Sequence, residues 1–105
     1  MSERVEMLKA ILAQNPGDSF ARYGLAMEYD KAGDTEGALA EFRRLLESNP
    51  DYTAAYQMAA QTLMRASRLP EARQMLEAGL ACARRTRNQH AQSEMQGMLD
   101  ELGVE

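Results

Sequence analysis

Histidine and cysteine, the side chains that most often bind metals or act as nucleophiles, occur once each, as His90 and Cys82. His90 has no second histidine or cysteine at ligand spacing, so a zinc site there would lack most of its ligands. Cys82 falls on a predicted helix without a general base in the surrounding pattern, which is typical of a small buried hydrophobe. We therefore expect no catalytic residue, no metal site and no cofactor.

Carboxylates are common, but their spacing does not suggest an acid and base pair. Neighbours such as Asp100 and Glu101 point in different directions from a helix and cannot face one another. The sequence also has no glycine-rich phosphate loop, and no strand pattern that would support one. These features predict that the protein is not an enzyme.

The composition indicates one small, acidic domain. Its 105 residues are 45% hydrophobic, which is enough to bury a core. A net charge of −4 argues against general binding to nucleic acid or to an anionic membrane. Charged residues interrupt every apolar run, so no membrane helix is expected. The single cysteine and the lack of a signal segment favour a reducing, cytoplasmic location.

The arginines are unevenly distributed. Six of them lie between Arg65 and Arg87, where the only acids are Glu71 and Glu77, and the tail after Arg87 carries only acids. The favoured interpretation is a solvated helix face, because arginine is a good helix former and suits the last turns of a helix. A docking patch for an acidic peptide is the alternative.

The elements that position these residues follow from an internal repeat. A shift of 34 residues superimposes like residues, and a period of this length is typical of stacked helical units. The matches are large apolar residues, alanines and Asn-Pro pairs: Leu12, Leu46 and Leu80; Leu8, Phe42 and Leu76; Ala21 and Ala55; Ala26 and Ala60; Ala32 and Ala66; Ala38 and Ala72; and Asn15-Pro16 with Asn49-Pro50.

Each class of matching residue has a role in helical hairpins. Small alanines let two helices approach closely, and large apolar residues at three- and four-residue spacing form the stripe that a helix buries. Proline disfavours the helical conformation in the residue before it, so Asn-Pro ends one helix and begins a turn.

The first whole unit resembles the tetratricopeptide repeat, a pair of antiparallel helices. The resemblance lies in Leu25-Ala26, Tyr29, Gly33-Asp34, Ala38, Phe42, Leu45 and Pro50. A second copy runs through Tyr56, Ala59-Ala60, Leu63, Ala72, Leu76 and Gly79. Two positions depart from the pattern. Arg22 stands where Tyr56 supplies an aromatic residue in the second copy, and Arg84 stands where a closing proline is expected.

We therefore predict an all-α fold of antiparallel helix-hairpin repeats, a right-handed superhelix like that of the tetratricopeptide family, forming one domain over residues 1–105. The expected parts are a half-repeat helix in 2–16, repeats in 19–52 and 53–86, and a capping helix in 88–102. The expected helices span 3–14, 19–32, 35–48, 53–66, 70–84 and 88–102. Expected caps are Ser2 and either Asp34 or Thr35, with Gly33 in a left-handed conformation.

The register of the last helix differs from that of the repeats. A strict shift would bury Ser93, Glu94 and Gly97, whereas one inserted residue restores an apolar face. This pattern favours a capping helix that shields the last repeat from water over a third repeat.

The resemblance implies a concave groove lined by the first helix of each unit. Carried over to this chain, the partner-binding residues are Phe20, Tyr23, Met27, Asp30, Lys31, Gln57, Gln61, Met64 and Arg65. The basic and asparagine residues with which some family members clamp a terminal carboxylate are missing, since Tyr23, Met27, Gln57 and Gln61 occupy those places. In the competing interpretation, Tyr23 and Phe20 only cover the opening helix.

The resulting functional prediction is a scaffold or adaptor that binds a peptide or protein segment in the groove. One alternative is self-association through the opening helix, a half unit that lacks its hairpin mate. Another is sequestration of a hydrophobic client segment in the manner of a chaperone, which eight methionines would suit because methionine adapts to irregular surfaces.

Overall fold

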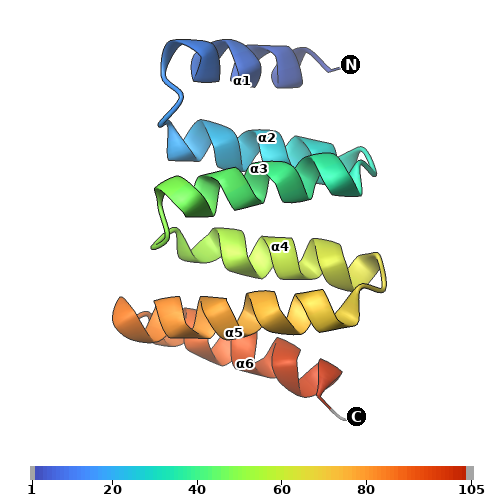
Figure 1. Ribbon diagram of the computed structural model, residues 1–105, viewed down its shortest axis with the longest axis vertical. Helices are drawn as coiled ribbons and strands as arrows, with labels where there is room; N and C mark the ends of the chain where they lie inside the picture. Colours follow the sequence, from blue (N-terminus) through green and yellow to red (C-terminus); the bar gives the residue numbers. More distant parts are fainter. Residues whose placement is uncertain (1, 104–105) are drawn as a thin grey trace.

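The computed structural model describes residues 2–103, and in that range it contains six helices and no strand (Figure 1). The predicted all-α hairpin architecture is confirmed, and every helix begins and ends within one residue of its predicted bounds. The helices are α1 (Glu3–Gln14), α2 (Ser19–Lys31), α3 (Thr35–Ser48), α4 (Thr53–Arg65), α5 (Leu69–Arg85) and α6 (Gln89–Leu102).

Local capping chemistry explains where the helices begin and end. The Ser2 hydroxyl accepts the Val5 N–H at 3.1 Å, as predicted for the start of α1. Asp34 caps α3, with its carboxylate 2.9 Å from the Gly37 nitrogen. Gly33 ends α2 with φ of +83°, a conformation that glycine adopts without steric cost.

The helices form a column, with the two ends of the chain at opposite ends of its long axis (Figure 1). Helices α2 and α3 make one antiparallel hairpin, and α4 and α5 make the next, while α1 packs on α2 and α6 packs on α5 and the edge of α4. The core runs between these layers. Its largest fully buried side chains include Leu39, Phe42, Leu45 and Leu63.

Leu46 is less buried than its repeating position suggests. It lies partly buried between the two larger core clusters, whereas the adjacent Leu45 is fully buried. The period identifies both leucines as apolar positions, but the packing of the neighbouring helices decides which of them water reaches.

Arg22 performs part of the role of the missing aromatic residue. The Tyr56 hydroxyl donates to the Pro50 carbonyl at 2.7 Å, and one arm of the Arg22 guanidinium donates to the equivalent Pro16 carbonyl at 3.2 Å. The other arm donates to buried Glu41 at 2.7 Å. The departure from the family pattern thus keeps one hydrogen bond and adds an ion pair.

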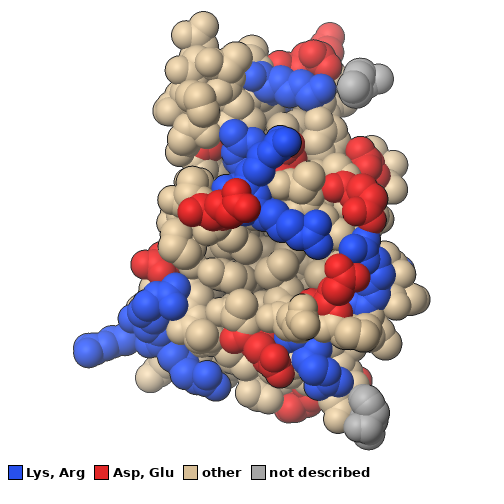
Figure 2. Space-filling view, in the orientation of Figure 1, with Lys and Arg blue, Asp and Glu red and all other residues tan. Residues whose placement is uncertain are grey.

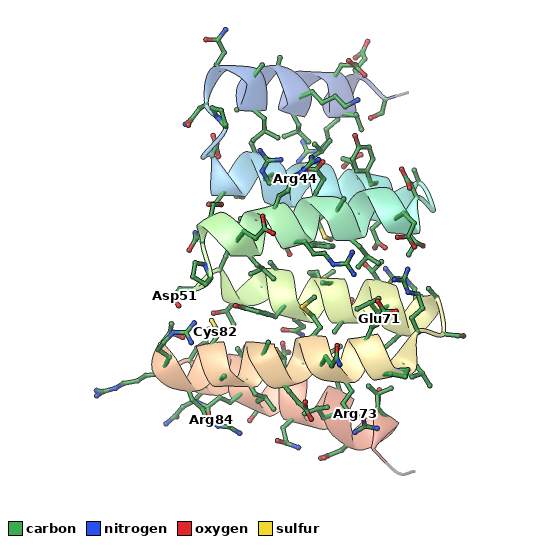
Figure 3. All side chains as sticks on the ribbon, in the orientation of Figure 1. Arg44, Asp51, Glu71, Arg73, Cys82 and Arg84 are labelled. Carbon is green, nitrogen blue, oxygen red and sulfur yellow. The ribbon has the colours of Figure 1, made fainter. Side chains whose placement is uncertain are left out.

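Glu41 is shared with a second arginine. Its other carboxylate oxygen accepts from Arg44 at 3.0 Å, and Arg44 is labelled on α3 in Figure 3. The position equivalent to Glu41 in the second repeat is Met75, so the two repeats use different chemistry at the same point.

The register of α6 reflects two additional residues, where one was predicted. The start of the first helix advances by 34 residues from Ser19 to Thr53, but by 36 from Thr53 to Gln89. With this shift, buried Ala91 and Met95 take the places of Ala55 and Ala59. The extra length comes from α5, which has 17 residues against 14 in α3.

A single glycine allows α4, α5 and α6 to meet closely. A Cβ atom added to Gly79 would lie 2.5 Å from the Met95 sulfur and 2.7 Å from the Tyr56 Cβ. No side chain larger than hydrogen fits there, so Gly79 sets the distance at which α6 closes the stack.

Candidate functional site

The predicted groove residues lie on α2 and α4, which the structure places next to each other. The Thr62 hydroxyl donates to Asp30 Oδ1 at 2.9 Å, and the Arg65 guanidinium pairs with Asp30 Oδ2. Asp30 and Arg65, both expected to line the groove, are brought together and bind one another across the two helices. Their charges are mutually neutralised.

Helix α6 joins this face through Glu94. The Gln57 side-chain amide donates to Glu94 Oε1 at 3.0 Å, and His90 Nε2 lies 3.3 Å from Glu94 Oε2. Sequence reasoning missed Glu94 because the 34-residue shift assigns it to a buried place. With the two additional residues in the register, Glu94 matches Met58 and not a predicted groove position, so its contact with Gln57 follows only from the packing of α6.

Phe20 is the most exposed large apolar side chain on the face, with 76% of its surface open to solvent. It therefore does not cover α1, as the competing interpretation required. It stands at the first turn of α2, where neither the core nor a hydrogen bond accounts for a large aromatic side chain. Exposed aromatic side chains of this kind are typical of interaction sites.

Tyr23 and Met27 are more deeply placed than surface anchors would be. The Tyr23 ring packs edge-on against Phe42, with centroids 6.2 Å apart, and lies 5.3 Å from Tyr52. Met27 and Met64 are partly buried against the same core cluster. Tyr23 thus covers α3 and the start of α4, and only part of each of these side chains is available to a partner.

The two tyrosines stay neutral at physiological pH. Burial raises the pKa of the Tyr23 hydroxyl above its ordinary value, and the neighbouring Tyr52 raises it further. Burial also raises the pKa of Tyr52, with a contribution from the Asp18 carboxylate. They can offer a partner aromatic surface and hydroxyl groups, but no negative charge.

The remaining predicted residues are spread over the face. Lys31 is well exposed, and its ammonium lies 3.4 Å from Glu28. It also borders a pocket of about 430 Å³ at the α1 end of the stack, with Ser2, Val5, Glu28, Tyr29, Ala32 and Asp34. Gln61 is half-buried on α4.

The opening helix α1, through which self-association was the predicted alternative, has apolar surface open to solvent. Met7 and Ile11 lie one turn apart there and are 53% and 39% exposed. Two further observations limit the chemistry of the described residues. No helix among residues 2–103 is long and apolar enough to cross a membrane, and that range has no cluster of histidine, cysteine or acidic side chains able to hold a metal ion.

Comparison with known proteins agrees with the repeat seen in sequence and structure. A family model described as tetratricopeptide repeat matches residues 30–95. A TPR repeat-containing protein of Pseudomonas aeruginosa is 34% identical over 98 residues, which is 93% of each chain.

Solved structures give the same result. The solution structure of a tetratricopeptide repeat domain protein from Salinibacter ruber is 32% identical, with a TM-score of 0.79 over 85% of this chain and 90% of that one. The TPR2B domain of yeast Sti1, in a complex with pHsp70, is 17% identical and superimposes with a TM-score of 0.86 over 93% of this chain and 78% of that one. The low identity of the yeast domain shows likeness of fold alone. With the family model, the relative and the repeat geometry in agreement, the chain belongs to the tetratricopeptide repeat family.

Proposed function

We propose that the protein is an interaction module that binds a segment of a partner protein across the face formed by α2, α4 and α6. The observation that carries the proposal is the exposure of Phe20, a large aromatic side chain on α2, while other apolar side chains of that helix are buried or partly buried in the core. Desolvating such a side chain against a partner contributes binding free energy, and aromatic anchors dominate many interfaces. Members of this family are interaction modules, which supports the same conclusion.

The charges on the face favour an uncharged, apolar segment. Asp30 binds Arg65, Lys31 lies beside Glu28, and Glu94 accepts a hydrogen bond from Gln57. A partner's charged group would have to displace these contacts before gaining its own. Recognition therefore rests on apolar contact, with polar groups at the edge fixing orientation.

Helix α1 extends the apolar surface. A Cβ atom added to Gly24 of α2 would lie 3.4 Å from Leu8 and 3.9 Å from Arg4, so this side of α1 faces Gly24. Ile11 follows Leu8 by three residues on α1, and Phe20 precedes Gly24 by four residues on α2. Because the two helices are antiparallel, Ile11 and Phe20 each lie one helical turn nearer to the loop that joins α1 and α2. On this basis the proposal places Ile11 and Phe20 on the same side of the α1–α2 pair, so that a bound segment could contact both.

The comparison with yeast Sti1 supports the proposal at the level of fold. Its TPR2B domain, described in a complex with pHsp70, has the helical arrangement found here. This chain lacks the basic and asparagine residues expected of a carboxylate clamp, because Tyr23, Met27, Gln57 and Gln61 occupy those places. An internal apolar segment therefore fits the face better than a terminal carboxylate does.

The test is site-specific photo-crosslinking in cells, followed by titration. A photoreactive phenylalanine at position 20 should capture a protein that the same group at Leu69 does not. Leu69 is the matched control because it is an exposed large apolar residue, 46% open to solvent, at the start of α5. The captured protein is then purified and titrated against Phe20→Ala and Leu69→Ala variants.

Phe20→Ala should weaken binding by about tenfold or more, the range for an aromatic anchor, while Leu69→Ala leaves it within about twofold. Circular dichroism should be unchanged in both variants. Equal affinities for the Phe20→Ala variant and the wild type would exclude this face. The double change of Tyr23 and Met27 to alanine is a less selective test, because these side chains also pack against the core and their loss lowers stability.

A second candidate function is self-association through α1. It is favoured by Ile11, which is 39% exposed although the equivalent Leu45 is fully buried by its hairpin partner. Light scattering of wild type and an Ile11→Lys variant tests it. A dimer that the substitution converts to a monomer supports the candidate, and a wild-type monomer at high concentration rejects it.

A further inference from the structure

A basic corner, defined as Arg84, Arg85 and Arg87 at the end of α5, differs from the rest of the charged surface. Over most of the face in Figure 2, basic and acidic side chains lie side by side. Arg84 and Arg87 are exposed and make no ion pair within residues 2–103. In that range Lys9, on α1, is the one other lysine or arginine that is exposed and makes no ion pair.

The third arginine of the corner is held in place. Arg85 donates to Asp51 at 2.7 and 3.0 Å and to the Pro50 carbonyl at 3.4 Å. Asp51 therefore neutralises one guanidinium and leaves two. In Figure 3, Arg84 is labelled below this end of α5, and Asp51 and Cys82 are labelled above it.

The corner coincides with the place where the chain departs from its repeat. Arg84 falls where the first repeat has Pro50, and α5 continues through Arg85 to 17 residues, against 14 in α3. The additional helical turn carries Arg84 and Arg85 beyond the point where the preceding repeat has already turned. Within this added turn Ala83 is fully buried, whereas Arg84 and Arg85 are exposed.

A left-handed turn at Arg87 follows the end of α5. Arg87 has φ of +58°, and the Arg87 and Asn88 N–H groups donate to the carbonyls of Arg84 and Ala83 at 3.1 and 2.8 Å. The same pair of hydrogen bonds ends α2, where Gly33 occupies the left-handed position. A Cβ atom is sterically opposed in this conformation, but Ser67 ends α4 in the same way with φ of +60°. The turn therefore holds Arg87 just beyond α5, beside the end of the helix that carries Arg84.

We propose that the basic corner docks an acidic segment of a partner protein. Guanidinium groups bind carboxylates through two parallel hydrogen bonds, and two free guanidiniums three residues apart match a pair of nearby carboxylates. A short acidic protein segment is favoured over nucleic acid because two unpaired guanidiniums can pair with only a few carboxylates, whereas the chain's net charge of −4 repels an extended polyanion. This site lies at the edge of the stack and is independent of the α2, α4 and α6 face.

The experiment uses a fluorescein-labelled hexaglutamate peptide as the probe and anisotropy at low ionic strength as the readout. The test variant combines Arg84→Gln with Arg87→Gly, since glycine removes the charge while relieving the left-handed conformation and so preserves the fold. Lys9→Gln is the matched control, because it removes an exposed, unpaired cation elsewhere.

The double variant should bind the probe about tenfold more weakly, with a shallower salt dependence, because two charge-assisted contacts are lost. Lys9→Gln should change the affinity by less than about twofold. Titration should also shift the side-chain Nε resonances of Arg84 and Arg87 in NMR spectra.

Two results would overturn the proposal. Equal losses in the Arg84/Arg87 variant and in Lys9→Gln, or no loss in either, would show that the corner is only solvated charge. Tighter binding of a hexathymidylate oligonucleotide than of hexaglutamate, lost in the same variant, would identify nucleic acid as the ligand.

Discussion

The Arg22–Glu41 ion pair provides a test of whether the two repeats can exchange the residues at equivalent buried positions. At the equivalent positions the second repeat has Tyr56 and Met75. Exchanging Arg22→Tyr and Glu41→Met together installs the second repeat's pair in the first. Each substitution alone leaves one member of the ion pair without its partner.

The structure sets the expected magnitudes. The Glu41 side chain is 9% exposed and that of Arg22 is 17% exposed, with 2.7 Å between their charged atoms. Arg22→Tyr leaves Glu41 with only Arg44, which is largely in solvent. Hydrogen bonds to charged groups contribute about 1.5 to 3 kcal/mol, so each single change should cost about 1 to 3 kcal/mol of unfolding free energy.

The double variant should recover most of this loss. The new tyrosine hydroxyl can donate to the Pro16 carbonyl as Tyr56 does to Pro50, and methionine places no charge in the core. We expect a net cost within about 1 kcal/mol and a coupling free energy of about 2 to 4 kcal/mol.

Equilibrium urea unfolding followed by circular dichroism measures these free energies, provided that the slope with urea concentration is the same in all four proteins. If the two single costs simply add in the double variant, the repeats are not interchangeable at this point and the reasoning fails. Separate variants of Arg44 serve as the control, because its largely exposed side chain should contribute less than about 1 kcal/mol.

Two further pairs of substitutions test the packing. Leu45→Ala should cost about 2 to 5 kcal/mol, because Leu45 is fully buried, whereas Leu46→Ala should cost about 1 to 2 kcal/mol at its partly exposed site; equal melting temperatures for the two variants would contradict this order. Gly79→Ala should destabilise by about 1 to 3 kcal/mol, because its Cβ would overlap Met95 and Tyr56. Gly97→Ala in the same hairpin should stabilise by about 0.5 to 1 kcal/mol, because nothing lies within 4 Å of the added carbon. Thermal unfolding of all four variants checks both orders, and a stabilising Gly79→Ala would show that α6 docks elsewhere.

The sequence alone determined the helices and their order. Helix formation and capping depend on residues within a few positions, so Ser2, Asp34 and Gly33 could be assigned their places before any contact was known. Hairpin pairing also followed, because the repeated apolar stripes can be buried only when neighbouring units stack. The sequence also placed Asp30 and Arg65 on the first helices of neighbouring repeats, but it did not predict their contact with each other.

Tertiary structure decided the depth of each residue and the partner of each charge. Tyr23 is half-buried against Phe42 and Tyr52, and Leu46 is partly buried between the two larger core clusters while the adjacent Leu45 is fully buried. Contacts such as Gln57 with Glu94 join residues 37 positions apart, and a change of two residues in the register of α6 alters which side chain faces α4. Helical periodicity specifies the face on which a side chain lies, but the tilt and separation of neighbouring helices set how far water reaches it.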